Sequence, residues 1–110
     1  MLDKKLVLAN KRSKYIHKLF KRESIGMGEF LILTETAVRK DQNIELPNVK
    51  WLQTELQVSF TKIKAILDPL EKKGFIIKII DDNDHRVKKI DITKVGFSYI
   101  SRLIENLPSE

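Results

Sequence analysis

The segment that most constrains the fold is residues 70–96, in the last third of the chain. Lys-Lys-Gly stands at residues 72–74, and a basic last turn followed by glycine is typical of a helix end. Residues 75–80 are apolar and β-branched, and residues 87–93 alternate apolar with polar side chains, so both stretches predict strands. Three aspartates and an asparagine at residues 81–84 are typical of a turn. The segment therefore predicts a β-hairpin with a charged tip between two helices.

The first part of the chain predicts two helices and a short strand. Residues 2–22 contain no glycine or proline and predict one long helix, which the glycines at 26 and 28 end. Apolar residues at helical spacing, including Met27, predict a second helix over residues 27–40. Residues 44–46 alternate in polarity and predict a short strand that the proline at 47 closes.

Two further helices separated by a tight turn precede the hairpin. A third helix is expected over residues 48–56 with its asparagine as cap, and residues 57–59 fit the turn of a helix-turn-helix. A fourth helix is expected over residues 60–73, capped by the preceding serine. Pro69 lies inside it, and a proline in a helix interior typically costs about 3 kcal/mol. We therefore expect a kink or a restart of this helix near Asp68.

Together these elements predict a winged helix-turn-helix. The fold class is α+β and mostly α, with a two- to three-stranded β-wing and an extra N-terminal helix. Residues 1–110 are expected to form one domain: a basic helix at 1–22, the winged helix-turn-helix core at 24–93, and a C-terminal helix at 94–107 that Thr93 can cap. At 42% hydrophobic and 33% charged residues, a chain of this length can bury a modest core.

The charge of the chain is concentrated at its start. The net charge is +6, and residues 1–22 hold eight Lys or Arg against one Asp, so residues 23–110 sum to −1. A basic total suggests a polyanionic partner, although a solvated lysine-rich face is the alternative. Cysteine is absent, which excludes disulfides and thiolate metal sites. No apolar run is long enough to span a bilayer, so we expect a cytoplasmic protein with no membrane partner.

Two motifs within residues 70–96 resemble those of MarR-type regulators. Residues 84–96, DHRVKKIDITKVG, are similar to the wing signature D-x-R-x-x-x-V-x-L-T-x-x-G, and residues 70–76, LEKKGFI, to the junction L-E-x-K-G-[LFW]-[IV]. The resemblance covers about residues 30–96. It implies a homodimeric transcriptional regulator that binds double-stranded DNA, with a recognition helix in the major groove and the wing near the minor groove. It implies no enzyme activity.

The chain departs from this family mainly at its ends. One C-terminal helix of about fourteen residues stands where MarR-type proteins have a pair, which resembles the short SarA-type branch. That resemblance implies that the N-terminal helix contributes heavily to the dimer. Its apolar seam, which also includes Ser13, supplies the expected dimer-contact residues: Leu2, Leu6, Ala9, Ile16 and Phe20.

The expected DNA contacts lie on the outward face of the fourth helix and on the wing. Short hydroxyls and lysines near a helix N-terminus suit phosphates and base edges, although an ordinary solvated face is the alternative. No arginine lies on this helical face, so we expect shallow base readout or readout of DNA shape. Arg86 can enter a narrow minor groove or brace the wing by pairing with Asp84 or Asp82. The predicted DNA-binding residues are Ser59, Thr61, Lys62, Lys64, Arg86 and Lys88.

Other residues are assigned structural or surface roles. Trp51 and Phe60 are expected in the core, and His17 and His85 on the surface, because neither histidine has a partner at metal or catalytic spacing. No cofactor, metal or catalytic residue is expected, and a small-molecule effector is left open. Two alternatives remain for the function: a centromere-binding or architectural DNA-binding protein of a plasmid or phage, or a winged-helix protein-interaction module whose lysine-rich first helix contacts an acidic partner.

Overall fold

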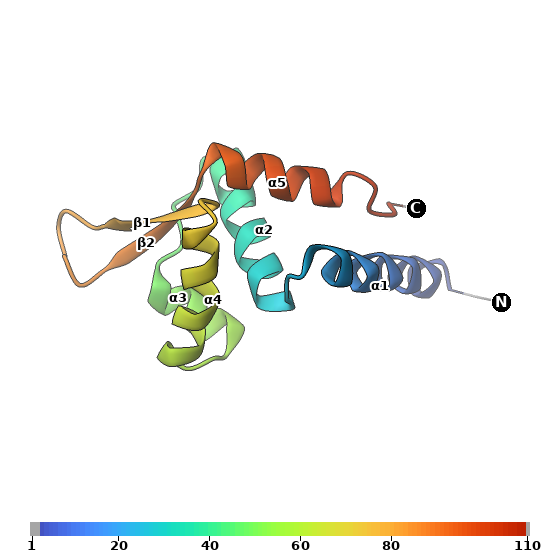
Figure 1. Ribbon diagram of the computed structural model, residues 1–110, viewed down its shortest axis with the longest axis horizontal. Helices are drawn as coiled ribbons and strands as arrows, with labels where there is room; N and C mark the ends of the chain where they lie inside the picture. The colour runs from blue at the N-terminus through green and yellow to red at the C-terminus, as the bar shows by residue number, and fades with distance from the viewer. Residues whose placement is uncertain (1–2, 110) are drawn as a thin grey trace.

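The computed structural model describes residues 3–109, which form five helices and one two-stranded antiparallel sheet (Figure 1). Helix α2 occupies the centre, α3 and α4 lie below it, and the hairpin and α1 extend toward opposite ends of the molecule. This is the mostly helical winged helix-turn-helix that the sequence predicts. The elements are α1 (Lys4–Glu23), α2 (Met27–Asp41), α3 (Val49–Leu56), α4 (Phe60–Lys72), β1 (Ile76–Ile80), β2 (Lys88–Ile92) and α5 (Lys94–Ile104).

One face of helix α1 packs against the rest of the molecule. Asp3 caps it by accepting a hydrogen bond from the backbone N–H of Lys5, and Leu19 is its one buried residue. The Tyr15 hydroxyl donates to the backbone carbonyl of Leu103, and Arg12 Nε donates to the carbonyl of Pro108 at 2.7 Å. These long-range bonds hold α1 against the C-terminal segment.

Helix α2 forms the central wall of the core. Phe30, Ile32 and Leu33 are buried in it, whereas Met27, expected on the same apolar face, is 52% exposed at the first position of the helix. Gly28 marks the close approach of α2 to α4, since a Cβ atom there would lie 2.8 Å from Cδ1 of Ile66. The core is completed by apolar side chains of every other element.

The helix-turn-helix is defined by side-chain caps, as predicted. Asn48 Oδ1 accepts from the N–H of Trp51 at 2.7 Å, and Ser59 Oγ accepts from the N–H of Lys62 at 3.2 Å. Between the two helices, Gln57 adopts a left-handed conformation with φ of 55°. Each cap satisfies one backbone donor that the helix itself leaves free.

The expected restart of α4 near Asp68 is wrong. The helix runs from Phe60 to Lys72 with Pro69 inside it. Asp68 does not act as a cap, because its carboxylate accepts from Lys78 Nζ of β1 at 3.1 Å. Pro69 lies near the end of the helix, where it removes a single backbone bond, and the buried Leu70 anchors the last turn.

The wing consists of two strands and one additional bridge. Ile76 pairs with Ile92 and Ile80 with Lys88, which fixes the register of the hairpin. The strand predicted at residues 44–46 does not form. Its place is taken by a single bridge between Asn48 and Lys89, because α3 begins directly after Asn48 and leaves no room for a ladder.

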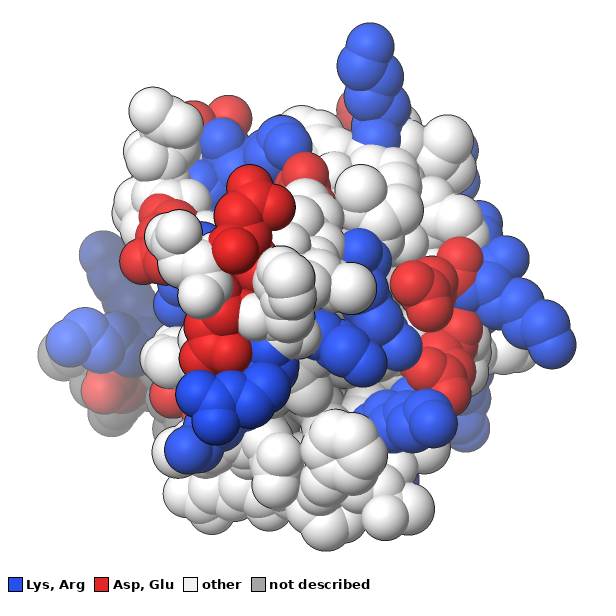
Figure 2. Space-filling view, turned by 90° about the vertical axis from the view of Figure 1, so that its left-hand side faces the viewer, with Lys and Arg blue, Asp and Glu red and all other residues white. Residues whose placement is uncertain are grey.

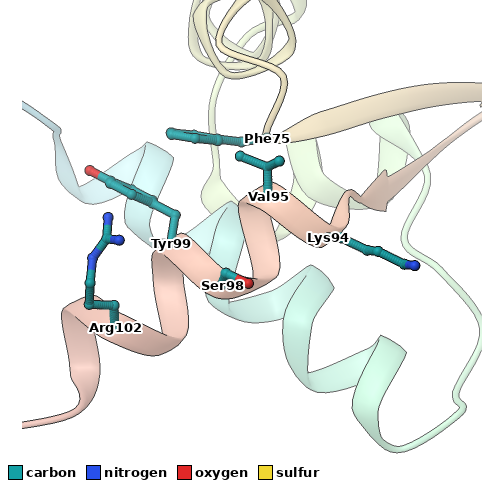
Figure 3. Close-up of a pocket in the computed structure, with 6 residues that line it drawn as sticks. All are labelled: Phe75, Lys94, Val95, Ser98, Tyr99 and Arg102. Atoms are coloured by element: carbon teal, nitrogen blue, oxygen red, sulfur yellow. The ribbon is translucent and has the colours of Figure 1, made fainter.

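An aromatic stack joins the start of the wing to α5. The rings of Phe75 and Tyr99 lie face to face with centroids 4.4 Å apart, and the guanidinium of Arg102 lies 5.8 Å from the centroid of the tyrosine ring (Figure 3). The Tyr99 hydroxyl donates to Glu23 at the end of α1 at 3.1 Å. Burial and this bond to Glu23 raise the pKa of Tyr99 to about 12. The stack therefore connects the wing, α5 and α1.

Among residues 3–109, no helix has the length and apolar character needed to cross a membrane.

Candidate nucleic-acid interface

The first two turns of α4 present a polar surface opposite the core. Ile63 of this helix is fully buried, and the predicted residues Ser59, Thr61, Lys62 and Lys64 are all exposed. Ser59 Oγ accepts from the Lys62 backbone, so its hydroxyl hydrogen stays available to donate to an acceptor such as a phosphate oxygen. Each of the four predicted residues is therefore accessible, and Lys62 and Lys64 lie on the two sides of the buried Ile63 around the helix.

The lysines of this surface are not neutralised by the protein. Within residues 3–109, neither Lys62 nor Lys64 lies within ion-pair distance of a carboxylate. The nearby acidic side chain of the same helix, Asp68, pairs with Lys78 instead. Two uncompensated cations at the N-terminal half of a helix, where the dipole is also positive, favour an anionic ligand.

Arg86 both braces the wing tip and stays accessible. Its Nε lies 3.1 Å from Asp84 Oδ1 and its Nη2 lies 3.3 Å from Asp84 Oδ2, while 91% of its side chain is exposed. Hydrogen bonds from the side chain and backbone of Arg86 lower the pKa of Asp84. Exposed pairs of this kind are weak, so the guanidinium can exchange its carboxylate for another anion.

The two lysines of β2 have different surroundings. Lys88 is exposed, whereas Lys89 is half-buried between Glu45, at 3.2 Å, and Asp81, at 3.5 Å. The hydrogen bond to Glu45 is the largest cause that raises the pKa of Lys89. Lys89 therefore holds the wing to the segment before α3, and Lys88 is the lysine of this strand that is accessible to a ligand.

The wing as a whole carries no net charge. Between residues 76 and 92, four Lys or Arg balance four Asp. Figure 2 shows the end of the molecule that carries the wing, with acidic and basic groups interleaved and an uncharged area at its lower edge, over the α3–α4 turn. A general attraction for phosphate is therefore weak here, and contacts depend on individual side chains.

A groove of about 790 Å³ connects the helix-turn-helix with the wing. It is lined by residues of α3, by Phe60 at the start of α4, and by the wing from Asp84 to Lys88. The prediction that Phe60 belongs to the core is wrong, because its side chain is 63% exposed and lines this groove. Trp51 does pack against the core, with the Arg39 guanidinium 4.3 Å from its ring centroid. No local sequence pattern distinguishes Phe60 from Trp51 in this respect.

The predicted dimer-contact residues fall into two groups. Leu6 is 63% exposed and Ala9 is exposed, so this part of the seam is open. Ile16 is half-buried, and the ring of Phe20 packs edge-on against Phe30 within the same chain. Leu2 lies outside the described residues. The histidines His17 and His85 are both exposed, as expected.

A helix-turn-helix followed by a two-stranded wing defines the winged helix-turn-helix class, and comparisons with known proteins agree with it. No family model matches the chain. The chain is similar to two HTH-type transcriptional regulators of Escherichia coli: PapX, at 40% identity over 52 residues, and PrsX, at 31% identity over 98 residues. These matches cover 47% and 88% of the chain but only 32% and 57% of the two relatives, so the chain spans less than two thirds of either.

Solved structures of transcriptional regulators share this fold. The regulator BldR of Sulfolobus solfataricus superimposes with a TM-score of 0.69 at 24% identity, over 90% of this chain and 67% of BldR. MepR of Staphylococcus aureus in complex with DNA gives a TM-score of 0.72 at 17% identity, over 90% of this chain and 77% of MepR. The heme sensor protein PefR of Streptococcus agalactiae gives 0.68 at 22% identity, over 93% and 69%.

These structures confirm the fold that the resemblance to MarR-type regulators implied. At such identities the likeness concerns the fold alone. The narrower resemblance to the SarA-type branch stays a prediction.

Proposed function

We propose that this chain is a homodimeric transcriptional regulator that binds double-stranded DNA in a sequence-dependent manner. The observation that carries the proposal is the exposed start of α4, whose lysines have no ion-pair partner within residues 3–109 and whose first residue, Phe60, lines one groove with the accessible wing residues Arg86 and Lys88. Two relatives are named transcriptional regulators, and one similar structure is a complex with DNA. We infer that such a regulator acts in the cytoplasm and has no catalytic role.

Each part of this surface has a distinct task in the proposed complex. Ser59 and the N-terminus of α4 bind a phosphate, which sets the position of the helix on the duplex. Thr61, Lys62 and Lys64 reach base edges in the major groove. Arg86 enters the adjacent minor groove, where a narrow A·T-rich segment concentrates negative potential. Sequence dependence then comes partly from DNA shape, because no arginine of α4 is available for bidentate guanine contacts.

The proposed dimer uses the part of α1 that its own chain leaves uncovered. This helix extends away from the body at the end opposite the wing (Figure 1), and Leu6 and Ala9 are exposed on it. The basic side chains of α1 carry most of the excess positive charge, so a dimer packed through the apolar seam leaves them to the solvent. Two recognition helices would then read half-sites about 10 base pairs apart.

The proposal is tested by selecting bound sequences from random duplex DNA and measuring mass in solution. The selected operator is then titrated with Lys62→Ala/Lys64→Ala and, as a matched control, Lys72→Ala/Lys73→Ala at the other end of the same helix. All four lysines are exposed, so the charge change is equal. We expect the first pair alone to weaken binding and to relax the sequence preference at the base pairs that Lys62 and Lys64 contact.

Three outcomes would contradict the proposal. If both variant pairs lose the same affinity for the operator, net charge explains the effect and α4 has no specific role in recognition. Absence of any enriched sequence would remove sequence dependence. A solution mass equal to that of one chain, at concentrations that bind the operator, would contradict the proposed homodimer.

A further inference from the structure

Phe60 departs from the behaviour of the other phenylalanines. The chain has five, and the other four, Phe20, Phe30, Phe75 and Phe97, are buried or half-buried. Phe60 is 63% exposed, although phenylalanine is among the residues most often fully buried. It is also the first residue of α4, directly after the capping Ser59. A large apolar ring therefore lies open at the position where a recognition helix meets its ligand.

The groove that Phe60 lines contains two cations of the proposed DNA interface and one further lysine. Exposed Lys50, Arg86 and Lys88 belong to the same groove, from α3 on one side and from the wing on the other. Asp84 is its one acidic residue, and that carboxylate is engaged by Arg86. The groove thus combines positive groups that attract a phosphate backbone with an apolar ring at the end of α4. This composition favours a DNA strand over an apolar peptide, which would offer no anionic partner to Lys50 and Lys88.

The major groove offers this ring one apolar group. Of the base edges exposed there, only thymine presents a methyl group, at C5, and aromatic side chains contact it in specific complexes. The other residues at the start of α4 are hydroxyls and lysines, which read donors and acceptors. Phe60 offers the largest apolar surface among them for contact with that methyl group, since Thr61 and Ala65 contribute one methyl group each.

We propose that Phe60 is a specificity-determining residue whose ring packs against the C5 methyl group of a thymine in each half-site. The proposal rests on the proposed function and deepens it. It also accounts for specificity on a recognition helix that lacks arginine, because methyl recognition needs no hydrogen-bond donor.

The test removes the methyl group from the DNA and the ring from the protein. The full chain is titrated against its selected duplex, in which each thymine is replaced in turn by uracil, which lacks only the C5 methyl group. We expect one position in each half-site to lose affinity about fourfold, the effect of burying one methyl group. Phe60→Ser should bind the thymine and uracil duplexes equally. Val95→Ser, which removes another exposed apolar side chain from α5, should keep the fourfold preference.

Two outcomes would overturn the proposal. The first is a thymine preference that persists in Phe60→Ser; if that variant also weakens binding to the thymine and uracil duplexes by the same factor, the ring contacts the backbone or lies between bases. The second is the absence of any uracil-sensitive position for the unsubstituted chain.

Folding and the proposed function are checked separately. The thermal midpoint of Phe60→Ser is measured, and Phe60→Leu, which keeps an apolar side chain, should retain part of the thymine preference. A chain that binds no duplex at all refutes the proposed function, whereas sequence-dependent binding without methyl dependence refutes only the role of Phe60.

Discussion

Gly96 of α5 lies directly against the backbone of Phe75. A Cβ atom at position 96 would overlap the Phe75 carbonyl oxygen and lie 2.9 Å from both its carbonyl carbon and its Cα. Phe75 belongs to the junction motif of residues 70–76, and Gly96 ends the wing signature, so this contact brings the two sequence motifs together. The glycine is required by the close approach of two backbone segments, since its φ is not in the left-handed region.

Gly96→Ala is therefore expected to destabilise the fold strongly. The methyl group would have to displace main-chain atoms, and overpacking of this kind typically costs about 1–3 kcal/mol or somewhat more. The free energy of unfolding from denaturant titration measures the change. Ser98→Ala, at an exposed position of the same helix, serves as the control and should change stability by less than about 0.5 kcal/mol. Similar losses from both substitutions would show that the backbone contact is not the cause.

Thr93 closes the same junction with its hydroxyl. Its Oγ1 donates to the Gly74 carbonyl at 2.6 Å and accepts from the N–H of Gly96 at 3.0 Å, so one atom joins the end of α4 to the start of α5. Thr93→Ala should lower the free energy of unfolding by about 1–2 kcal/mol, because it removes a helix cap and a tertiary bond. Thr93→Ser keeps both bonds and should retain most of the stability. If serine and alanine destabilise the protein alike, the methyl group of Thr93 matters more than its hydroxyl.

Ionisation of Tyr99 lowers the stability of the fold at high pH. Burial, with Glu23 as a hydrogen-bond partner, raises its pKa from 10.0 to about 12, so the unfolded chain loses this proton at lower pH than the folded chain. A group with a raised folded pKa contributes stability that is fully present below its unfolded pKa and is lost as pH rises. We therefore expect the free energy of unfolding to fall between pH 10 and 12.

Tyr99→Phe isolates this contribution. It keeps a ring that can stack on Phe75 and removes the ionisable group. Denaturant titrations across that pH window should show a smaller decline for this variant than for the unsubstituted chain. Tyr15→Phe is the comparison, because it removes the other tyrosine hydroxyl and should leave the Tyr99 part of the decline in place. An unchanged slope in Tyr99→Phe would assign the decline to other groups.

The sequence predicted the features that depend on neighbouring residues. The caps at Asn48, Ser59 and Thr93 follow from side-chain chemistry within three positions, and all three form as expected. The strand at residues 44–46 was wrong because three alternating residues do not distinguish a strand from an extended connection. The restart near Asp68 was wrong because the carboxylate has a partner in β1 that local sequence does not reveal.

The candidate interface was predictable only in part, for the same reason. Lys88 and Lys89 are adjacent and chemically identical, yet only their positions in the folded hairpin place Lys89 between Glu45 and Asp81. The exposure of Phe60 likewise depends on how α3 and the wing border the start of α4. Helical periodicity indicates which side of a helix is apolar, but it does not show where the packed core ends.

The pair between Arg86 and Asp84 restrains the proposed minor-groove contact, and its removal should strengthen DNA binding. Asp84→Asn removes the negative charge that holds the guanidinium, while an amide oxygen can still accept from the Arg86 backbone N–H. We expect affinity for the selected duplex to rise by about two- to fivefold, the range of an exposed ion pair. Asp82→Asn removes the same charge from the wing tip without touching Arg86, and should have a smaller effect.

Arg86→Ala should weaken binding and cancel the gain from Asp84→Asn when the two are combined. Equal gains from the two aspartate variants would show that only the charge of the wing tip matters, and an additive double variant would show that Arg86 and Asp84 act on DNA independently.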